Sequence, residues 1–174
     1  MNHISLRIAA ASLLASGASA AALAAGPTDP QIAHIAYTAG AIDIAAGKQA
    51  LTRSHNKAVR AFASEMVRDH AAVNVKALTL VKKLHVTPEA NPTSAALSKQ
   101  AAENLRRLSH LNGRNFDRAY AANELAYHKI VNGALSDTLI PAAHNGELKS
   151  LLETGLALFR EHQMHADHLV ADLK

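Results

Sequence analysis

The chain has 174 residues, enough for one domain with a sizeable hydrophobic core. Aromatic residues make up 3% of the chain, Trp is absent and alanine is abundant, which favours closely packed helices over a sheet. The absence of cysteine excludes disulfides, thiolate metal sites, a cysteine nucleophile and a lipidated N-terminal cysteine. A formal net charge of +4 is too small to indicate a nucleic-acid binder, so we expect no nucleic-acid partner.

The N-terminus has the pattern of a secretory signal peptide over residues 1–24. Arg7 precedes an apolar run that begins at Ile8, and Ala22-Leu23-Ala24 provides the small-x-small pattern of a cleavage site. We expect cleavage after Ala24, with Ala18-Ser19-Ala20 as an alternative site and an uncleaved anchor as the alternative interpretation. The cleaved product is expected in the periplasm or outside the cell, with peripheral contact to the envelope or outer membrane as a further expectation.

Apolar residues then recur at the helical spacing of three and four, and proline, glycine and asparagine interrupt the pattern. Thr28, Ser54 and Asn115 are the predicted N-caps of the first, second and third long helices. The Thr87-Pro88 and Asn91-Pro92 pairs end the second helix, because proline disfavours helix at the residue before it. The predicted helices are about 29–53, 55–84, 94–108, 116–139 and 147–173.

Four of these helices are long and form two hairpins, joined by about 30 residues that hold a short helix. This connectivity is typical of a ferritin-like four-helix bundle with a short extra helix in its long crossover. A plain up-down bundle stays open, because the short helix need not travel the length of the bundle. We therefore predict one all-α domain over residues 29–174 and assign no oligomeric state.

Each long helix carries one ionisable residue near its middle, inside the apolar stripe: Asp43, His70, His128 and His162. Such residues are costly to bury unless they satisfy one another or hold a ligand. At ~1.5 Å per residue, Glu124, one turn before His128, lies within a few ångströms of the level of His162. Counting residues in the same way from the turn between the first two helices, Asp43 and His70 differ in height along the bundle by roughly 7 Å.

Neutral imidazoles and carboxylates bind iron, manganese, zinc or copper, so these five residues are the predicted ligands of a divalent transition metal. Asp69, Tyr120 and His165 are candidates for positions beside the ligands, where a second layer of contacts orients them. The alternative is a buried hydrogen-bonded network that fixes the helix register without any ligand. Both interpretations stay open at this point.

The sequence favours a non-enzymatic protein without deciding the matter, because it has no serine nucleophile motif, phosphate loop or dinucleotide fingerprint. A ferritin-like di-iron site needs Glu-x-x-His on two helices, yet apolar residues stand three positions before each mid-helix histidine. Haem is disfavoured by the lack of Cys-x-x-Cys-His and the scarcity of aromatic residues. Arg106, Arg107, Arg114 and Arg118 form either a contact to the envelope or a solvated basic face.

Four parts of the sequence resemble those of a known protein family. They are Phe62-Ala63-Ser64-Glu65-Met66-Val67-Arg68-Asp69-His70, Phe116-Asp117-Arg118-Ala119-Tyr120, His128 and Arg160-Glu161-His162. From about Asp29 to Leu169 the chain resembles domain-of-unknown-function family 4142, exported bacterial proteins often labelled as outer-membrane proteins and placed in the ferritin-like superfamily. The resemblance implies a ferritin-like helical fold and envelope export but no reaction. Asp43 stands where the family usually has Glu, and Ala157 where it usually has Pro.

Two functional hypotheses follow. In the first, an exported bundle binds a metal ion for metal handling or envelope stress defence. In the second, the protein is a non-enzymatic envelope interaction module, and its buried polar residues only specify packing.

Overall fold

The computed structural model describes residues 26–174, and all the regular structure in that range is helical. The elements are α1 (Asp29–Arg53), α2 (Lys57–Lys83), α3 (Pro92–Ser109), α4 (Gly113–Ala134), the π-helical turn η1 (Leu135–Leu139), α5 (Ile140–Ala142) and α6 (Gly146–Asp172). The all-α prediction is therefore confirmed. The predicted signal peptide and its cleavage site lie outside the described residues.

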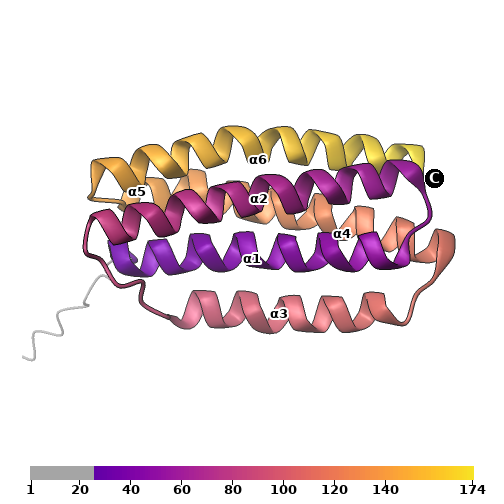
Figure 1. Ribbon diagram of the computed structural model, residues 1–174, viewed down its shortest axis with the longest axis horizontal. Coiled ribbons are helices and arrows are strands. Elements are labelled where there is room, and N and C mark those ends of the chain that lie inside the picture. The colour runs from indigo at the N-terminus through magenta and orange to yellow at the C-terminus, as the bar shows by residue number, and fades with distance from the viewer. Residues whose placement is uncertain (1–25) are drawn as a thin grey trace, which may run out of the picture.

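Two antiparallel hairpins, α1 with α2 and α4 with α6, form the bundle (Figure 1). Between them α3 lies along α1 and carries the chain back to the other end, so that α2 and α4 run in the same direction. This is the connectivity of a ferritin-like bundle with one crossover, and the plain up-down alternative is excluded. The crossover helix has 18 residues, more than predicted, and at ~1.5 Å per residue it is about 27 Å long.

Two of the predicted N-caps are wrong, because the helices begin at other residues than expected. Asn56 rather than Ser54 caps α2, because its side chain accepts hydrogen bonds from the backbone amides of Ala58 and Val59. The Ser54 hydroxyl instead donates to Asp117 Oδ1 at 2.5 Å, which ties the α1–α2 turn to α4. The third long helix begins at Gly113, earlier than a cap at Asn115 requires.

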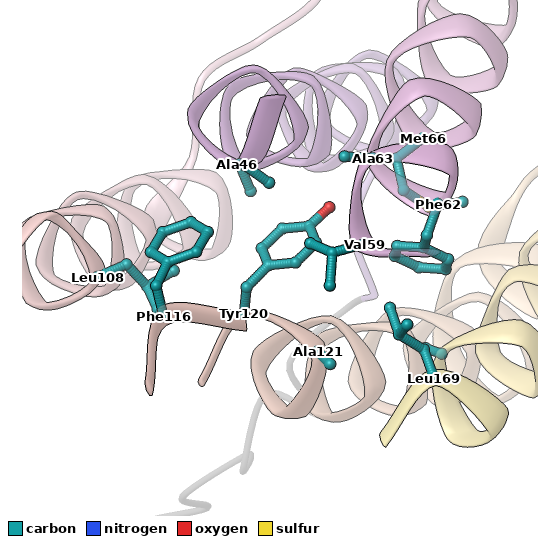
Figure 2. Close-up of a cluster of buried hydrophobic side chains, with 12 residues drawn as sticks. Ala46, Val59, Phe62, Ala63, Met66, Leu108, Phe116, Tyr120, Ala121 and Leu169 are labelled. Carbon is teal, nitrogen blue, oxygen red and sulfur yellow. The ribbon is translucent and has the colours of Figure 1, made fainter. Parts of the chain in front are cut away.

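Two apolar clusters form the core, one toward each end of the bundle. The first surrounds Tyr120, which packs against Phe62 and Phe116 with ring centroids 6.2 and 6.1 Å away (Figure 2). The second contains Ile32, Ile35, Leu135, Leu139, Ala143, Leu148, Leu152, Leu156 and Phe159. In the sequences of α1, α4 and α6, the predicted ligands fall between members of the two clusters, so they lie near mid-bundle.

Close helix packing brings the backbones near this middle level together. A Cβ added at Gly47 of α1 would lie 2.9 Å from the Ala63 carbonyl oxygen of α2, so only glycine permits this approach. Within residues 26–174, none of the helices combines the length and apolar character needed for a membrane span.

Candidate metal centre

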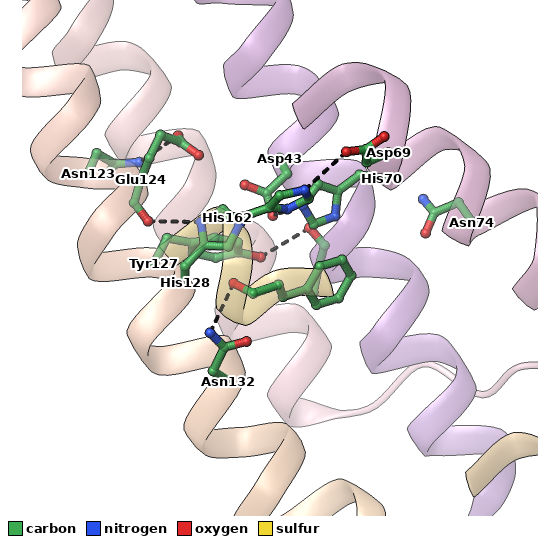
Figure 3. A network of polar contacts seen from close by, with 12 residues as sticks. Asp43, Asp69, His70, Asn74, Asn123, Glu124, Tyr127, His128, Asn132 and His162 are labelled. Atoms are coloured by element: carbon green, nitrogen blue, oxygen red, sulfur yellow. Dashed lines mark hydrogen bonds and ion pairs between the residues drawn. The ribbon is translucent and has the colours of Figure 1, made fainter. Parts of the chain in front are cut away.

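Three imidazoles from three helices meet in the middle of the bundle. His70 of α2, His128 of α4 and His162 of α6 are each at most 1% exposed. Their ring centroids are 5.3 to 5.7 Å apart (Figure 3), and one nitrogen of each lies within 4.8 Å of a nitrogen of the other two. The structure therefore brings the three predicted histidines together at one level.

Hydrogen bonds determine which ring nitrogen of two of these histidines has a free lone pair. His128 Nδ1 lies 3.0 Å from the Glu124 carbonyl oxygen, which only accepts, so Nδ1–H donates and Nε2 keeps its lone pair. His162 Nε2 likewise donates to Asp69 Oδ2 at 3.2 Å, which leaves the lone pair on Nδ1. Both lone-pair nitrogens are buried and have no hydrogen-bond partner among residues 26–174.

The His70 ring is held mainly by packing. It stacks on Phe159, with centroids 4.5 Å apart and planes 16° from parallel. Its Nε2 lies 3.4 Å from Asp43 Oδ2, a close contact without the geometry of a hydrogen bond, and neither ring nitrogen has a partner in the described part of the chain.

All three imidazoles are neutral at pH 7, which is the form that binds metals. Burial, followed by the neighbouring histidines His128 and His162, lowers the pKa of His70 to about 2. Burial also lowers the pKa of His128 to about 4. The pKa of His162 is lowered by burial as well, although its bond to Asp69 opposes the shift.

Two buried carboxyl groups complete the centre. Asp43 and Glu124 are 2% and 1% exposed, and one oxygen of each lies within 4.8 Å of the other and of a His128 nitrogen. Burial raises the pKa of Glu124 to about 7. Burial and the Glu124 charge raise the pKa of Asp43 well above its usual value. Near neutral pH the pair therefore retains a proton, which a bound cation would displace.

The position of Asp43 differs from the rough offset estimated from the sequence. Measured from the observed helix ends, Arg53 and Lys57, the offset between Asp43 and His70 is about 4.5 Å instead of about 7 Å. The Asp and His side chains span this distance, which explains their 3.4 Å contact.

The three residues predicted to lie beside the ligands have different surroundings. Asp69 accepts from His162 and is itself held by two bonds from Arg68, of 2.7 and 3.0 Å, which lower the pKa of Asp69. His165 has a side chain 55% exposed and pairs with Glu65 at 2.8 Å, away from the buried nitrogens. Tyr120 belongs to the aromatic cluster, and burial raises the pKa of its hydroxyl, with the Glu124 and Asp43 carboxyls contributing.

A third group of potential ligands leads from the centre toward the surface. One oxygen each of Glu65 and Asp69 and one nitrogen of His162 lie within 4.8 Å of one another. Glu65 was not predicted as a site residue, although it stands four positions before Asp69 and therefore on the same face of α2.

Polar contacts around the centre tie its helices together. Asn132 Nδ2 donates to the Phe159 carbonyl at 3.2 Å, joining α4 to α6. Tyr127 donates to the Ala39 carbonyl at 3.1 Å, and Asn74 Nδ2 to the Tyr37 carbonyl at 3.3 Å. Both asparagines stand four residues after a centre histidine, in the repeated pattern His-x-x-x-Asn. That repeat was the available sequence signal, and it was missed.

These donors fit a first-row divalent ion. Metal–nitrogen and metal–oxygen bonds are about 2.0–2.2 Å, so donors around one ion lie about 3–3.5 Å apart. The buried donors form two overlapping groups that share His128, one with His70 and His162 and one with Asp43 and Glu124, and the candidate ligand atoms within each group lie within 4.8 Å of one another. Three neutral nitrogens and two carboxyl groups suit iron, manganese, zinc or copper(II) better than softer ions.

Comparison with known proteins gives one family and no individual relatives. A family model described as "Domain of unknown function (DUF4142)" matches residues 14–169, which is most of the chain. No curated protein and no solved structure gives a significant match.

Proposed function

We propose, for a chain that belongs to the DUF4142 family, that the protein binds one divalent transition-metal ion in the middle of its bundle. His70, His128 and His162 supply the nitrogen ligands. The observation that supports this most directly is the set of buried lone-pair nitrogens that have no partner within residues 26–174. Each unsatisfied buried polar group costs about 1–3 kcal/mol, and a network built only for packing pairs such groups instead.

The carboxyl groups adjust the charge of the site. Asp43 is the nearer candidate ligand, because it already touches His70, and Glu124 shares its proton. When a cation binds, the pair loses that proton and carries the negative charge that neutralises the ion. Asp69, fixed by Arg68, orients the His162 ring and favours its Nδ1 as ligand.

Metal handling or envelope stress defence is the role that this centre supports best. The ligand residues are at most 2% exposed, so the site has the enclosure needed to hold an ion and lacks the open face needed by a bulky substrate. Export to the periplasm is part of the proposal and depends on the signal-peptide pattern in the sequence.

Calorimetric titration of the metal-free protein with Zn²⁺, Mn²⁺ and Co²⁺ tests this function. We expect one tight site per chain, and the visible spectrum of the Co²⁺ form reports nitrogen ligation. The variant His128→Ala/His162→Ala is expected to lose the site. The control His55→Ala/His168→Ala removes two exposed histidines and is expected to retain it. Failure of all three ions to bind, or equal binding by both variants, would contradict the proposal and favour a packing network.

A further inference from the structure

An apolar cavity of about 510 Å³ lies inside the bundle, between the histidine centre and the end where α6 begins. Its walls come from α1, α2, α4, η1 and α6, together with the start of α3, and no charged side chain of the described residues lines it. Apolar cavities accept apolar ligands, and small-molecule sites typically measure about 300–1,000 Å³.

Small residues keep this space open. Ala36 and Ala39 of α1 and Gly155 of α6 line it at positions where a packed bundle core has larger side chains. A Cβ added at Gly155 would meet only the Phe159 ring, at 3.5 and 3.8 Å, which is ordinary contact. The side chain of a larger residue at this position would therefore extend into the cavity.

The cavity is elongated and opens on one side. Along α6 its walls extend from Leu148 to Phe159, which at ~1.5 Å per residue is roughly 16 Å. Five exposed residues line the cavity, Pro92 and Thr93 of α3, Ile130 and Ala134 of α4, and Thr138 of η1, so the opening is between α3 and α4. Two of these rim residues carry hydroxyl groups, whereas the deeper walls are mainly aliphatic.

We propose that this cavity binds a single-chain amphiphile of the fatty-acid class, with its aliphatic chain inside and its polar head at the rim. The length and aliphatic walls fit one extended chain better than a compact ring system. The rim hydroxyls of Thr93 and Thr138 offer hydrogen bonds to a head group that stays in contact with water. The proposal is independent of the metal site.

The inner end of the cavity adjoins the histidine centre. Phe159 lines the cavity and stacks on the His70 ring, 4.5 Å away. A chain that fills the cavity therefore presses on the ring that packs against His70. We expect binding to shift the NMR signals of the His70 imidazole in the metal-free protein, which gives a local readout of occupancy.

Calorimetric titration of the delipidated protein with octanoate, decanoate and dodecanoate tests the proposal. Each added methylene group is expected to tighten binding about fourfold, until the chain is longer than the cavity. The filled variant Ala36→Leu/Gly155→Leu is expected to bind dodecanoate at least about tenfold more weakly. The control Ala61→Leu makes a similar change on the exposed face of α2 and is expected to bind normally.

Three results would overturn the proposal. The first is equal affinity of the filled variant and the control, provided that both retain the helical circular dichroism of the wild type. The second is an absence of chain-length dependence in the wild-type protein, which decides the question even if the filled variant does not fold. The third is absence of binding by a dimeric protein, which would indicate that a second copy covers the opening.

Discussion

Replacement of His70 by leucine is expected to make the metal-free protein more stable while abolishing metal binding. The His70 ring is 1% exposed, and neither of its nitrogens has a hydrogen-bond partner in the described residues. Leucine has a similar volume and no polar atoms, so the variant removes two unsatisfied groups from the core. A residue retained for packing would behave in the opposite way.

The expected gain in the free energy of unfolding of His70→Leu is the difference between opposing contributions. Two unsatisfied nitrogens cost about 1–3 kcal/mol each. Loss of the stacking on Phe159 removes about 0.5–1.5 kcal/mol, and imperfect repacking up to about 1.5 kcal/mol. At the midpoints of these ranges, the expected net change is an increase of about 2 kcal/mol in the free energy of unfolding.

Urea denaturation of both proteins at pH 7.5, with a chelator present, measures this difference. Met66→Leu is the matched control, because Met66 is also fully buried, one turn earlier on α2, and it is expected to change stability by less than about 1.5 kcal/mol. With metal at 100 times its Kd, only the wild type and the control should gain about 2.7 kcal/mol. Loss of more than about 1 kcal/mol in metal-free His70→Leu would refute the reasoning and identify His70 as a satisfied packing residue.

Three further predictions concern the ligand protons, the ligand orientation and the helix packing. Because burial raises the pKa of Glu124 to about 7, bound protons compete with the metal below that pH, and calorimetry should show the metal affinity rising about tenfold per pH unit up to pH 7 and then levelling. Glu124→Gln removes this proton and should lose the rise, so an equal rise in the variant would contradict the prediction. Asp69→Asn removes the carboxylate that orients His162, and we expect metal affinity to fall about 10–100-fold by the same assay; unchanged affinity would remove Asp69 from the site. Gly47→Ala forces α1 and α2 apart and should lower the free energy of unfolding, measured by urea denaturation, by about 1–3 kcal/mol. Gly133→Ala, whose Cβ meets no described atom within 4 Å, should raise it by about 1 kcal/mol, and equal changes in the two variants would contradict the close approach of α1 and α2.

Hydrophobic periodicity was sufficient to predict the bundle, because each long helix buries one stripe and the stripes share a common axis. It also predicted that His70, His128 and His162 approach one another, since each lies on its stripe near the middle of a helix. The caps were less predictable. Ser54 and Asn56 are both good capping residues, and only the contact of Ser54 with Asp117 shows why Asn56 is the cap.

Features that depend on relative helix position were not predictable from one sequence. The hydrogen bond between His162 and Asp69 joins two helices, and the sequence does not specify how each helix is rotated about its own axis. The small residues of α1 near Asp43 were consistent with close packing or with open space, and the structure has both. Gly47 and Gly40 both approach α2 closely, at Ala63 and Asn74, whereas Ala36 and Ala39 line the cavity.

The metal content of the protein purified from its own host tests the central claim most directly. Mass-spectrometric metal analysis of the wild type and of His70→Ala/His162→Ala, prepared without added metal or chelator, gives the ratio of ion to chain. The proposed centre predicts a near-stoichiometric transition metal in the wild type and its loss from the variant. A wild type without metal, or a variant that keeps it, would contradict the proposed centre.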